Sequence, residues 1–224
     1  MVPASRVVYT AITNRHAELS PRPEVPDTDF ICYSDVALDR DDWQIRPVAA
    51  LAGLSPRMRA KFHKVFPPLG YEWSVWVDGA YALRTDGDAK LLVDDLIQRS
   101  PSGFGLHEHG GRDCLFDEVV HAATLPKCEG QTQILQEQAR HYEAMGHPRN
   151  WGLWAAGFMC RRNSSRVSEI MERWWEELSR WSWRDQISLS FVLRNAGFRP
   201  DAWPWPLFPI GSNPYVRNWN FNPS

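Results

Sequence analysis

Cysteine is scarce in this chain, and the few cysteines lie far apart. The four residues, Cys32, Cys114, Cys128 and Cys160, include no C-x-x-C pair. Structural zinc sites and redox dithiols usually rely on such pairs, so we expect buried free thiols and no zinc site. Free thiols are typical of a reducing compartment, and we predict a cytoplasmic protein.

Long apolar runs are also missing. No segment approaches the roughly 20 apolar residues that a membrane helix needs, so membrane insertion is not expected. Residues 1–10 lack the basic flank and apolar core of a signal peptide. The formal net charge is only -2, which argues against a large basic face for DNA or RNA.

Two phosphate-binding signatures are absent, because the sequence contains neither G-x-G-x-x-G nor a Walker A motif. Any phosphate group must therefore be bound by cationic side chains. Arg57, Lys61 and Lys64 are the candidates, since they follow one another at helical spacing (i, i+4, i+7) within residues 55–66. A solvated helix face is the alternative interpretation.

The chain does contain alternating strand and helix patterns over 224 residues, enough for one domain with a substantial core. Strands are expected over residues 6–14, 29–35, 43–48, 71–77 and 151–161, and helices over 55–66, 89–99, 114–123, 131–145, 167–180 and 184–195. This order predicts an α/β fold with a mostly parallel central sheet flanked by helices. We expect one domain over residues 1–199, a loop over 103–111, and an irregular tail over 200–224 that packs on the domain.

Polar side chains follow three of the expected strands. They are Asn14, Asp35 and Asp78, the last of which is followed at once by Gly79. The carboxyl ends of parallel strands meet at one sheet edge, where ligands bind. A carboxylate there is suited to hold a divalent metal against nucleotide phosphates. An ordinary Asp-Gly turn is the alternative for Asp78.

Two further polar groups stand out. The loop LHEHGGRD contains His107, His109 and Arg112, which predict either a metal site, a loop that positions a sugar or acceptor through His109 and Arg112, or a structural role. Asp185 and Gln186 open a predicted helix. They either stabilise its N-terminus or bind sugar hydroxyl groups.

In combination these segments resemble a glycosyltransferase of the GT-A type. The similarity is greatest to the family that includes plant mucilage and pollen glycosyltransferases, and more distant to the glycogenin-like family. The matching pieces are YTAITN, DFICYSD, PRMRAKFHK, WVDGA, HEHGGRDC, WGLWAAGFMCRRN and WWEELSRWSWRDQISLSFVL. The resemblance covers most of residues 6–195 and implies a single nucleotide-diphospho-sugar transferase domain.

The resemblance implies a nucleotide-sugar donor, a UDP-sugar, and a divalent ion such as Mn²⁺ or Mg²⁺. A hexosyl or related group would pass to an acceptor hydroxyl of a glycan, a protein or a nucleic acid. By position, the residues near base and ribose would be Thr10, Asn14 and Asp35, and those near the diphosphate or sugar would be Arg57, Lys61 and Lys64.

The same resemblance places Asp78 at the metal-binding D-x-D position, although the second acid of that motif is Ala80 here. A late histidine ligand is also missing, so Asn213, Asn218 or Asn220 is the candidate replacement. Asp185 and Gln186 match the late acidic motif that holds the donor sugar or the acceptor. An inverting path would need a base, for which Asp185 and Glu118 are candidates, whereas a retaining path would use the leaving phosphate.

Two alternatives remain open. The missing second acid suggests a module that binds nucleotide sugars without catalysis. The 12 tryptophans suggest an enzyme that glycosylates a base of a nucleic acid, since bases stack on indole rings.

Overall fold

The computed structural model describes residues 5–83, 92–203 and 216–218. Its strands are β1 Arg6–Ile12, β2 Thr28–Ser34, β3 Gln44–Pro47, β4 Trp73–Val77, β5 Tyr81–Leu83, β6 Phe104–Glu108, β7 Trp154–Arg162, β8 Asp201–Trp203 and β9 Val216–Asn218. Its α-helices are α1 Pro56–Val65, α2 Leu92–Gln98, α3 Leu115–Ala122, α4 Thr132–Ala144, α5 Ser165–Arg180 and α6 Asp185–Asn195, with a 3-10 turn η2 at Pro126–Cys128.

The centre of the molecule is a seven-stranded sheet in the order β3-β2-β1-β4-β7-β6-β8. Four of the pairings are parallel, namely β2–β3, β1–β2, β1–β4 and β6–β8. Strand β7 is antiparallel to both of its neighbours, β4 and β6. The prediction of an α/β fold with a mostly parallel sheet flanked by helices is therefore confirmed.

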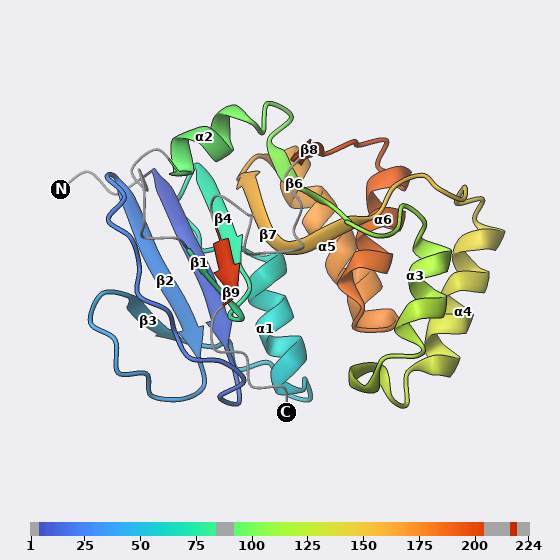
Figure 1. Ribbon diagram of the computed structural model, residues 1–224, viewed down its shortest axis with the longest axis horizontal. Helices are drawn as coiled ribbons and strands as arrows, with labels where there is room; N and C mark the ends of the chain where they lie inside the picture. Colours follow the sequence, from blue (N-terminus) through green and yellow to red (C-terminus); the bar gives the residue numbers. More distant parts are fainter. Residues whose placement is uncertain (1–4, 84–91, 204–215, 219–224) are drawn as a thin grey trace.

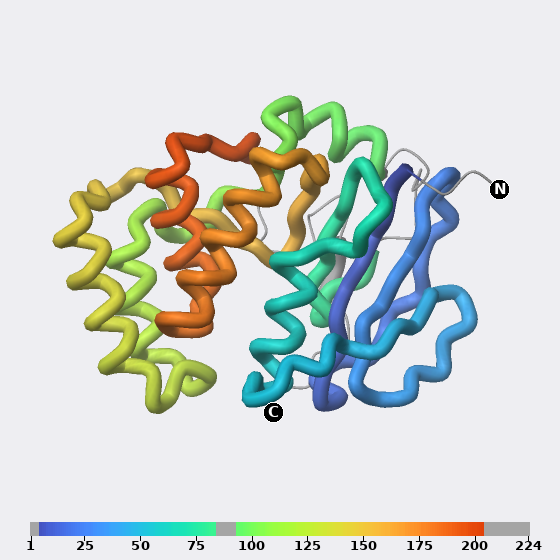
Figure 2. Tube along the Cα trace, turned by 180° about the vertical axis from the view of Figure 1, so that it is seen from behind, coloured from blue at the N-terminus to red at the C-terminus, as the bar shows by residue number. Residues whose placement is uncertain are grey.

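Both faces of the sheet are apolar, because side chains alternate between two cores along each strand. On β1, Val7 and Tyr9 belong to one core, and Val8 and Ile12 belong to the other. Helices α1, α3, α4, α5 and α6 cover the first face, and α2 lies at the second (Figure 1). The reverse view shows α1 beside α5 (Figure 2), in agreement with their contacts.

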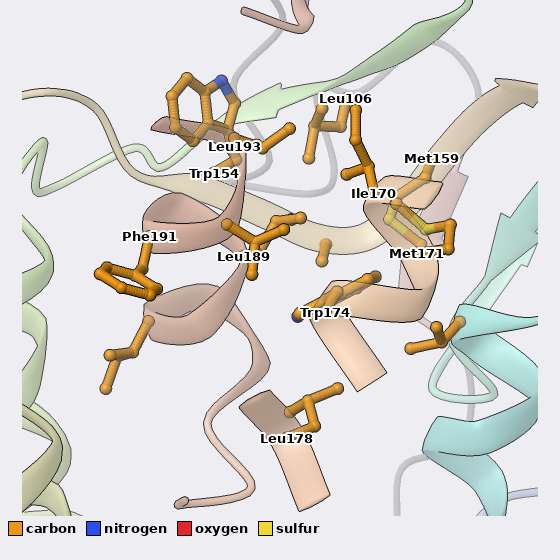
Figure 3. Packing of buried hydrophobic residues seen from close by; sticks show 14 of the residues in the cluster. Leu106, Trp154, Met159, Ile170, Met171, Trp174, Leu178, Leu189, Phe191 and Leu193 are labelled. Atoms are coloured by element: carbon orange, nitrogen blue, oxygen red, sulfur yellow. The ribbon is translucent and has the colours of Figure 1, made fainter. Parts of the chain in front are cut away.

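The helices begin and end where local chemistry predicts. Ser55 caps α1 by accepting a hydrogen bond from the Met58 amide at 3.2 Å, and Pro56 occupies the first turn. Helix α5 turns Ile170, Trp174 and Leu178 inward, where they meet α6 and β7 (Figure 3). Helix α6 is buried along most of its length, so its first residues are held firmly. No described helix has the length and apolarity that crossing a membrane requires.

Two expectations about irregular segments are wrong. The predicted loop over residues 103–111 contains the buried strand β6. Glycine is required inside this strand, because a Cβ at Gly105 would lie 2.1 Å from the Ser100 Oγ and 2.7 Å from the Trp203 ring. The tail expected to be irregular contributes β8 to the sheet and β9 to a pairing with β5. Strands of three residues are too short to show a period in the sequence.

Candidate functional site

The carboxyl ends of β2, β1 and β4 meet at one edge of the sheet, because the three strands are parallel neighbours. Asn14 and Asp35 lie together there, since the backbone N–H of Asn14 donates to the Asp35 Oδ1 at 2.8 Å. The Arg59 guanidinium approaches the other oxygen of Asp35 at 3.4 Å. Thr10 lies within β1 instead, where its buried Oγ1 has no hydrogen-bond partner among the described residues.

A cluster of two lysines and two aspartates occupies the next position along this edge; we call it the lysine cluster. The Lys64 ammonium lies 3.1 Å from the Asp78 Oδ1 and 2.7 Å from the Asp185 Oδ2. Lys61 donates to the same Asp185 oxygen at 2.9 Å. Residues predicted separately on α1, after β4 and at the start of α6 thus meet in one place.

Charge pairing controls protonation in the lysine cluster. Burial alone would raise the pKa of Asp185, but the ammonium groups of Lys61 and Lys64 outweigh it and hold that pKa well below its usual value. Burial alone would lower the pKa of Lys64, yet the carboxylates of Asp185 and Asp78 raise it. Asp185 is therefore ionised and Lys64 positively charged at neutral pH, whereas burial outweighs Asp185 at Lys61 and lowers its pKa.

Each end of Lys64 is held by a different part of the fold. Its backbone carbonyl accepts hydrogen bonds from the Tyr9 hydroxyl at 3.1 Å and from the Arg161 guanidinium at 2.9 Å. Its ammonium faces Asp78, whose Oδ1 also accepts from the Trp76 indole at 2.6 Å. The lysine side chain is only 5% exposed, whereas that of Asp78 is 37% exposed. The carboxylate is thus the part of this pair that solvent reaches.

Arg57 does not join the lysine cluster, although it shares a helix face with Lys61. Its guanidinium donates to the Lys127 carbonyl at 3.3 Å and lies 4.8 Å from the centre of the Trp183 ring. The spacing of the three cations predicts one basic helix face, but only Lys61 and Lys64 contact the aspartates. Arg57 lies beside the segment that leads into α6.

His109, Arg112 and Gln186 belong to a second group around Glu118, which we call the arginine cluster. The Glu118 side chain is 0% exposed and accepts from Arg112 at 2.7 Å and from Arg184. Arg184 also donates to the Gln186 Oε1 at 2.8 Å, and the His109 ring lies 3.3 Å from the Arg112 Nη2. Burial would raise the pKa of Glu118, but the two guanidinium groups lower it.

The described residues do not fit a divalent ion held by protein carboxylates. The Asp78 Oδ1 is already engaged by Trp76 and Lys64, and the Oδ2 of the neighbouring acid, Asp185, is engaged by both lysines. Within residues 5–83, 92–203 and 216–218, no group of three His, Cys, Asp or Glu side chains could hold a metal. Asn213 and Asn220 lie outside the described residues, and only the backbone of Asn218 is described. A metal at Asp78 remains a prediction.

Several contributors to the site were missed by sequence reasoning. Arg59 is two positions from Arg57, so it lies on another helix face and no stripe marks it. Gly157 on β7 accepts the Asp78 amide at 2.8 Å and has no Cβ to displace Tyr81. Arg184 precedes the predicted pair of site residues and bridges Glu118 to Gln186. The small residues of β7 were the available signal for close approach.

Comparison with known proteins gives one family and several remote structures. Residues 49–208 match the family described as "TOD1/MUCI70, glycosyltransferase-like domain". No curated protein matches the chain significantly. Among solved structures, the apo WbbM bifunctional glycosyltransferase is 12% identical with a TM-score of 0.46 over 86% of this chain and 38% of that chain. Apo mouse xyloside xylosyltransferase 1 is 12% identical with a TM-score of 0.47, over 85% of this chain and 81% of that one.

The chain therefore spans well under half of the WbbM chain. The family match itself contains the lysine cluster and the arginine cluster, whereas Thr10, Asn14 and Asp35 precede it.

Proposed function

Since the chain belongs to the TOD1/MUCI70 family of glycosyltransferase-like domains, we propose that it transfers a sugar from a nucleotide-sugar donor, a UDP-sugar, to an acceptor hydroxyl. One observation carries the proposal. The Lys64 ammonium bridges Asp78 and Asp185 at the carboxyl edge of the parallel strands, where ligands of α/β sheets bind.

The lysine cluster would bind the donor through its diphosphate. Lys64 pairs with Asp78 and Lys61 pairs with Asp185, and their ammonium groups would neutralise the charge that grows on the leaving diphosphate. Asn14 and Asp35 lie at the neighbouring strand ends, in place to bind ribose and base. Asp185 would accept hydrogen bonds from sugar hydroxyls and so fix the orientation of the donor sugar.

The cations that pair with Asp185 and Glu118 favour a retaining mechanism. Glu118 is enclosed by two arginines, and the pKa values of both Glu118 and Asp185 are lowered, which makes each of them a weak general base. In the proposed step the bond from the anomeric carbon to the phosphate oxygen breaks, and the acceptor oxygen bonds to that carbon on the same face. The acceptor proton passes to the departing diphosphate oxygen, and the anomeric carbon gains oxocarbenium character.

The first test is thermal stabilisation by UDP, GDP, CMP and their common sugar conjugates, with EDTA and with Mn²⁺. We expect UDP compounds to raise the melting temperature even in EDTA, because the lysines supply positive charge. Lys64→Met should lose most of this stabilisation, because it removes the cation that pairs with Asp78 and Asp185. Asp78→Asn should abolish transfer while the protein stays folded. Equal transfer by Asp78→Asn and the wild type would refute the site assignment.

A coupled measurement of UDP release separates catalysis from binding alone. Release that depends on an added acceptor supports transfer. Stabilisation by UDP-sugar with no release for any acceptor would support the alternative of a binding module.

A further inference from the structure

A separate cavity of about 550 Å³ lies beside the arginine cluster. Its walls come from the loop after β6, from the segment before β7, and from the chain after α6. The residues on which the following steps depend are Glu108, Asp113, Trp151, Trp154, Arg199 and the pair Gly110 and Gly111. None of them belongs to the lysine cluster.

The cavity faces the same edge of the sheet as Asp78. Strand β6 is parallel to β4, because β7 is antiparallel to both, so Glu108 ends β6 at that edge. The Asp78 amide bonds to Gly157, and Trp154 precedes Gly157 by three residues on β7. At about 3.3 Å per residue, the cavity wall at Trp154 begins roughly 10 Å from the backbone beside Asp78. This is a separation of about two sugar rings at most.

An ionic chain connects the cavity to the lysine cluster. Arg112 lines the cavity and donates to Glu118, which also accepts from Arg184. Arg184 immediately precedes Asp185, the residue that both lysines contact. The two regions are therefore positioned by one rigid set of side chains at the start of α6.

The lining combines aromatic rings with groups of both charges. The Arg199 guanidinium lies 5.1 Å from the Trp151 ring centre and 5.7 Å from that of Trp154. The Trp154 indole N–H is buried, and no hydrogen-bond acceptor reaches it from the described part of the chain. Glu108 and Asp113 add carboxylate oxygens to the same walls.

This chemistry fits a neutral carbohydrate better than an anion. Sugar hydroxyls both donate and accept hydrogen bonds, so they can satisfy a guanidinium and carboxylates together. The apolar face of a sugar ring packs on an indole. A polyanion would meet the carboxylates of Glu108 and Asp113, which repel it.

We propose that this cavity binds the acceptor as a neutral carbohydrate, with the Trp151 ring and the Arg199 guanidinium as its principal contacts. The role as acceptor rests on the proposed glycosyltransferase function. Binding of a sugar in the cavity does not, since it depends only on the cavity lining. An acceptor hydroxyl at the end of such a sugar would point along β7 toward the donor.

A variant that fills the cavity is available without disturbing the fold. A Cβ added at Gly111 meets no atom within 4 Å, and the backbone there is not in the left-handed region. Gly111 lines the cavity, so Gly111→Phe adds an aromatic ring at its wall without a clash at the first side-chain carbon. Leu69→Phe is the matched control, because Leu69 is 95% exposed and lies outside both sites.

The experiment is saturation-transfer NMR with methyl glycosides of glucose, galactose, xylose and rhamnose and with their disaccharides. At least one saccharide should bind the wild type and Leu69→Phe, and its affinity should fall at least tenfold in Gly111→Phe and in Trp151→Ala. UDP stabilisation should be the same in all four proteins. No binding of any saccharide to the wild type, or unchanged affinity in Gly111→Phe, would overturn the inference.

Failure of the proposed function has a different signature. Saccharide binding that Gly111→Phe abolishes, without stabilisation of the wild type by any nucleotide, would remove the donor site and the acceptor role. It would leave a carbohydrate-binding cavity.

Discussion

The lysine cluster and the arginine cluster lie on either side of the start of α6, yet they arrange charge in opposite ways. In the lysine cluster two cations converge on one oxygen of Asp185, and the second carboxylate, Asp78, is 37% exposed. In the arginine cluster a fully buried carboxylate, Glu118, receives one arginine on each oxygen.

The difference separates a group that can exchange partners from one that cannot. A phosphate that reaches Asp78 can compete for the Lys64 ammonium, because the exchange replaces one anion by another. Glu118 is not exposed to solvent, so breaking its bond to either arginine would leave a buried charge unpaired. We infer that the first cluster binds the donor and that the second holds the loop after β6 against α6.

Replacing Lys64 should have the largest effect on activity. Lys64→Met removes the cation that joins Asp78 to Asp185, and we expect transfer to fall about 100- to 1,000-fold. Single-turnover transfer and UDP stabilisation measure the change. Arg57→Met is the control, because Arg57 contacts Trp183 and not the aspartates. Equal losses of transfer in Lys64→Met and Arg57→Met would contradict the separation of Arg57 from the lysine cluster.

Replacing Glu118 should affect stability most. Glu118→Gln leaves the partly buried guanidinium groups of Arg112 and Arg184 without a carboxylate, and we expect a loss of about 3 kcal/mol in the free energy of unfolding. Asp117→Asn is the neighbouring control, since Asp117 is exposed and pairs loosely with Arg149 at 3.4 Å. Its loss should be below about 1 kcal/mol in urea denaturation. An unchanged free energy of unfolding in Glu118→Gln would show that the arginine cluster is not structural.

A smaller effect is expected at Gly157, which touches the lysine cluster from β7. A Cβ there would lie 2.8 Å from the Tyr81 ring and 3.1 Å from the Asp78 Oδ2, so Gly157→Ala must displace one of them. We expect about a tenfold loss of transfer with little loss of stability. Val120→Ile adds a methyl group to a side chain that is 70% exposed and lies outside both clusters and the cavity, so it should transfer normally. Normal transfer by Gly157→Ala would mean that the position of Asp78 is not critical.

At neutral pH the smallest effect is expected at His63, which lies outside both clusters and makes stability depend on pH. Burial lowers the pKa of His63 from 6.5 to about 4, and its neutral Nε2 accepts the Ala49 amide at 2.9 Å. The unfolded chain takes up this proton first, so stability is complete above about pH 6.5 and is lost as the pH falls toward 4. His63→Gln should reduce the fall of the melting temperature between these values, an effect that reaches about 3 kcal/mol only near pH 4. An unchanged profile would contradict the burial of a neutral ring.

The sequence allowed the strand ends and the helix faces to be predicted, because both depend on local periodicity. Asn14 and Asp35 meet as their positions after parallel strands imply, and Lys61 shares a face with Lys64. The partner of each cation depends on the position of α1 relative to the start of α6, and no local sequence pattern predicts that position. Arg57 and Lys61 were therefore grouped together although they contact different residues.

Strand β6 shows the opposite failure. Glycine is depleted in strands, so Gly105 and the glycines at 110 and 111 predict a loop for this segment. The strand is stabilised by neighbours distant in sequence, with β7 on one side and β8 on the other. Tertiary contacts override local propensity here, and they also place His109 at the sheet edge.

Arg161 lies beneath the lysine cluster, fully buried, and no carboxylate of the described chain pairs with it. Its charge is solvated by the Tyr9 hydroxyl and by the carbonyl groups of Lys64 and Val65. A cation in this low-dielectric interior projects a positive potential toward the sheet edge without touching any ligand. Mobile ions cannot enter between this buried charge and a nucleotide bound at the edge, so that interaction should weaken little with salt, whereas attraction from solution should fall with ionic strength.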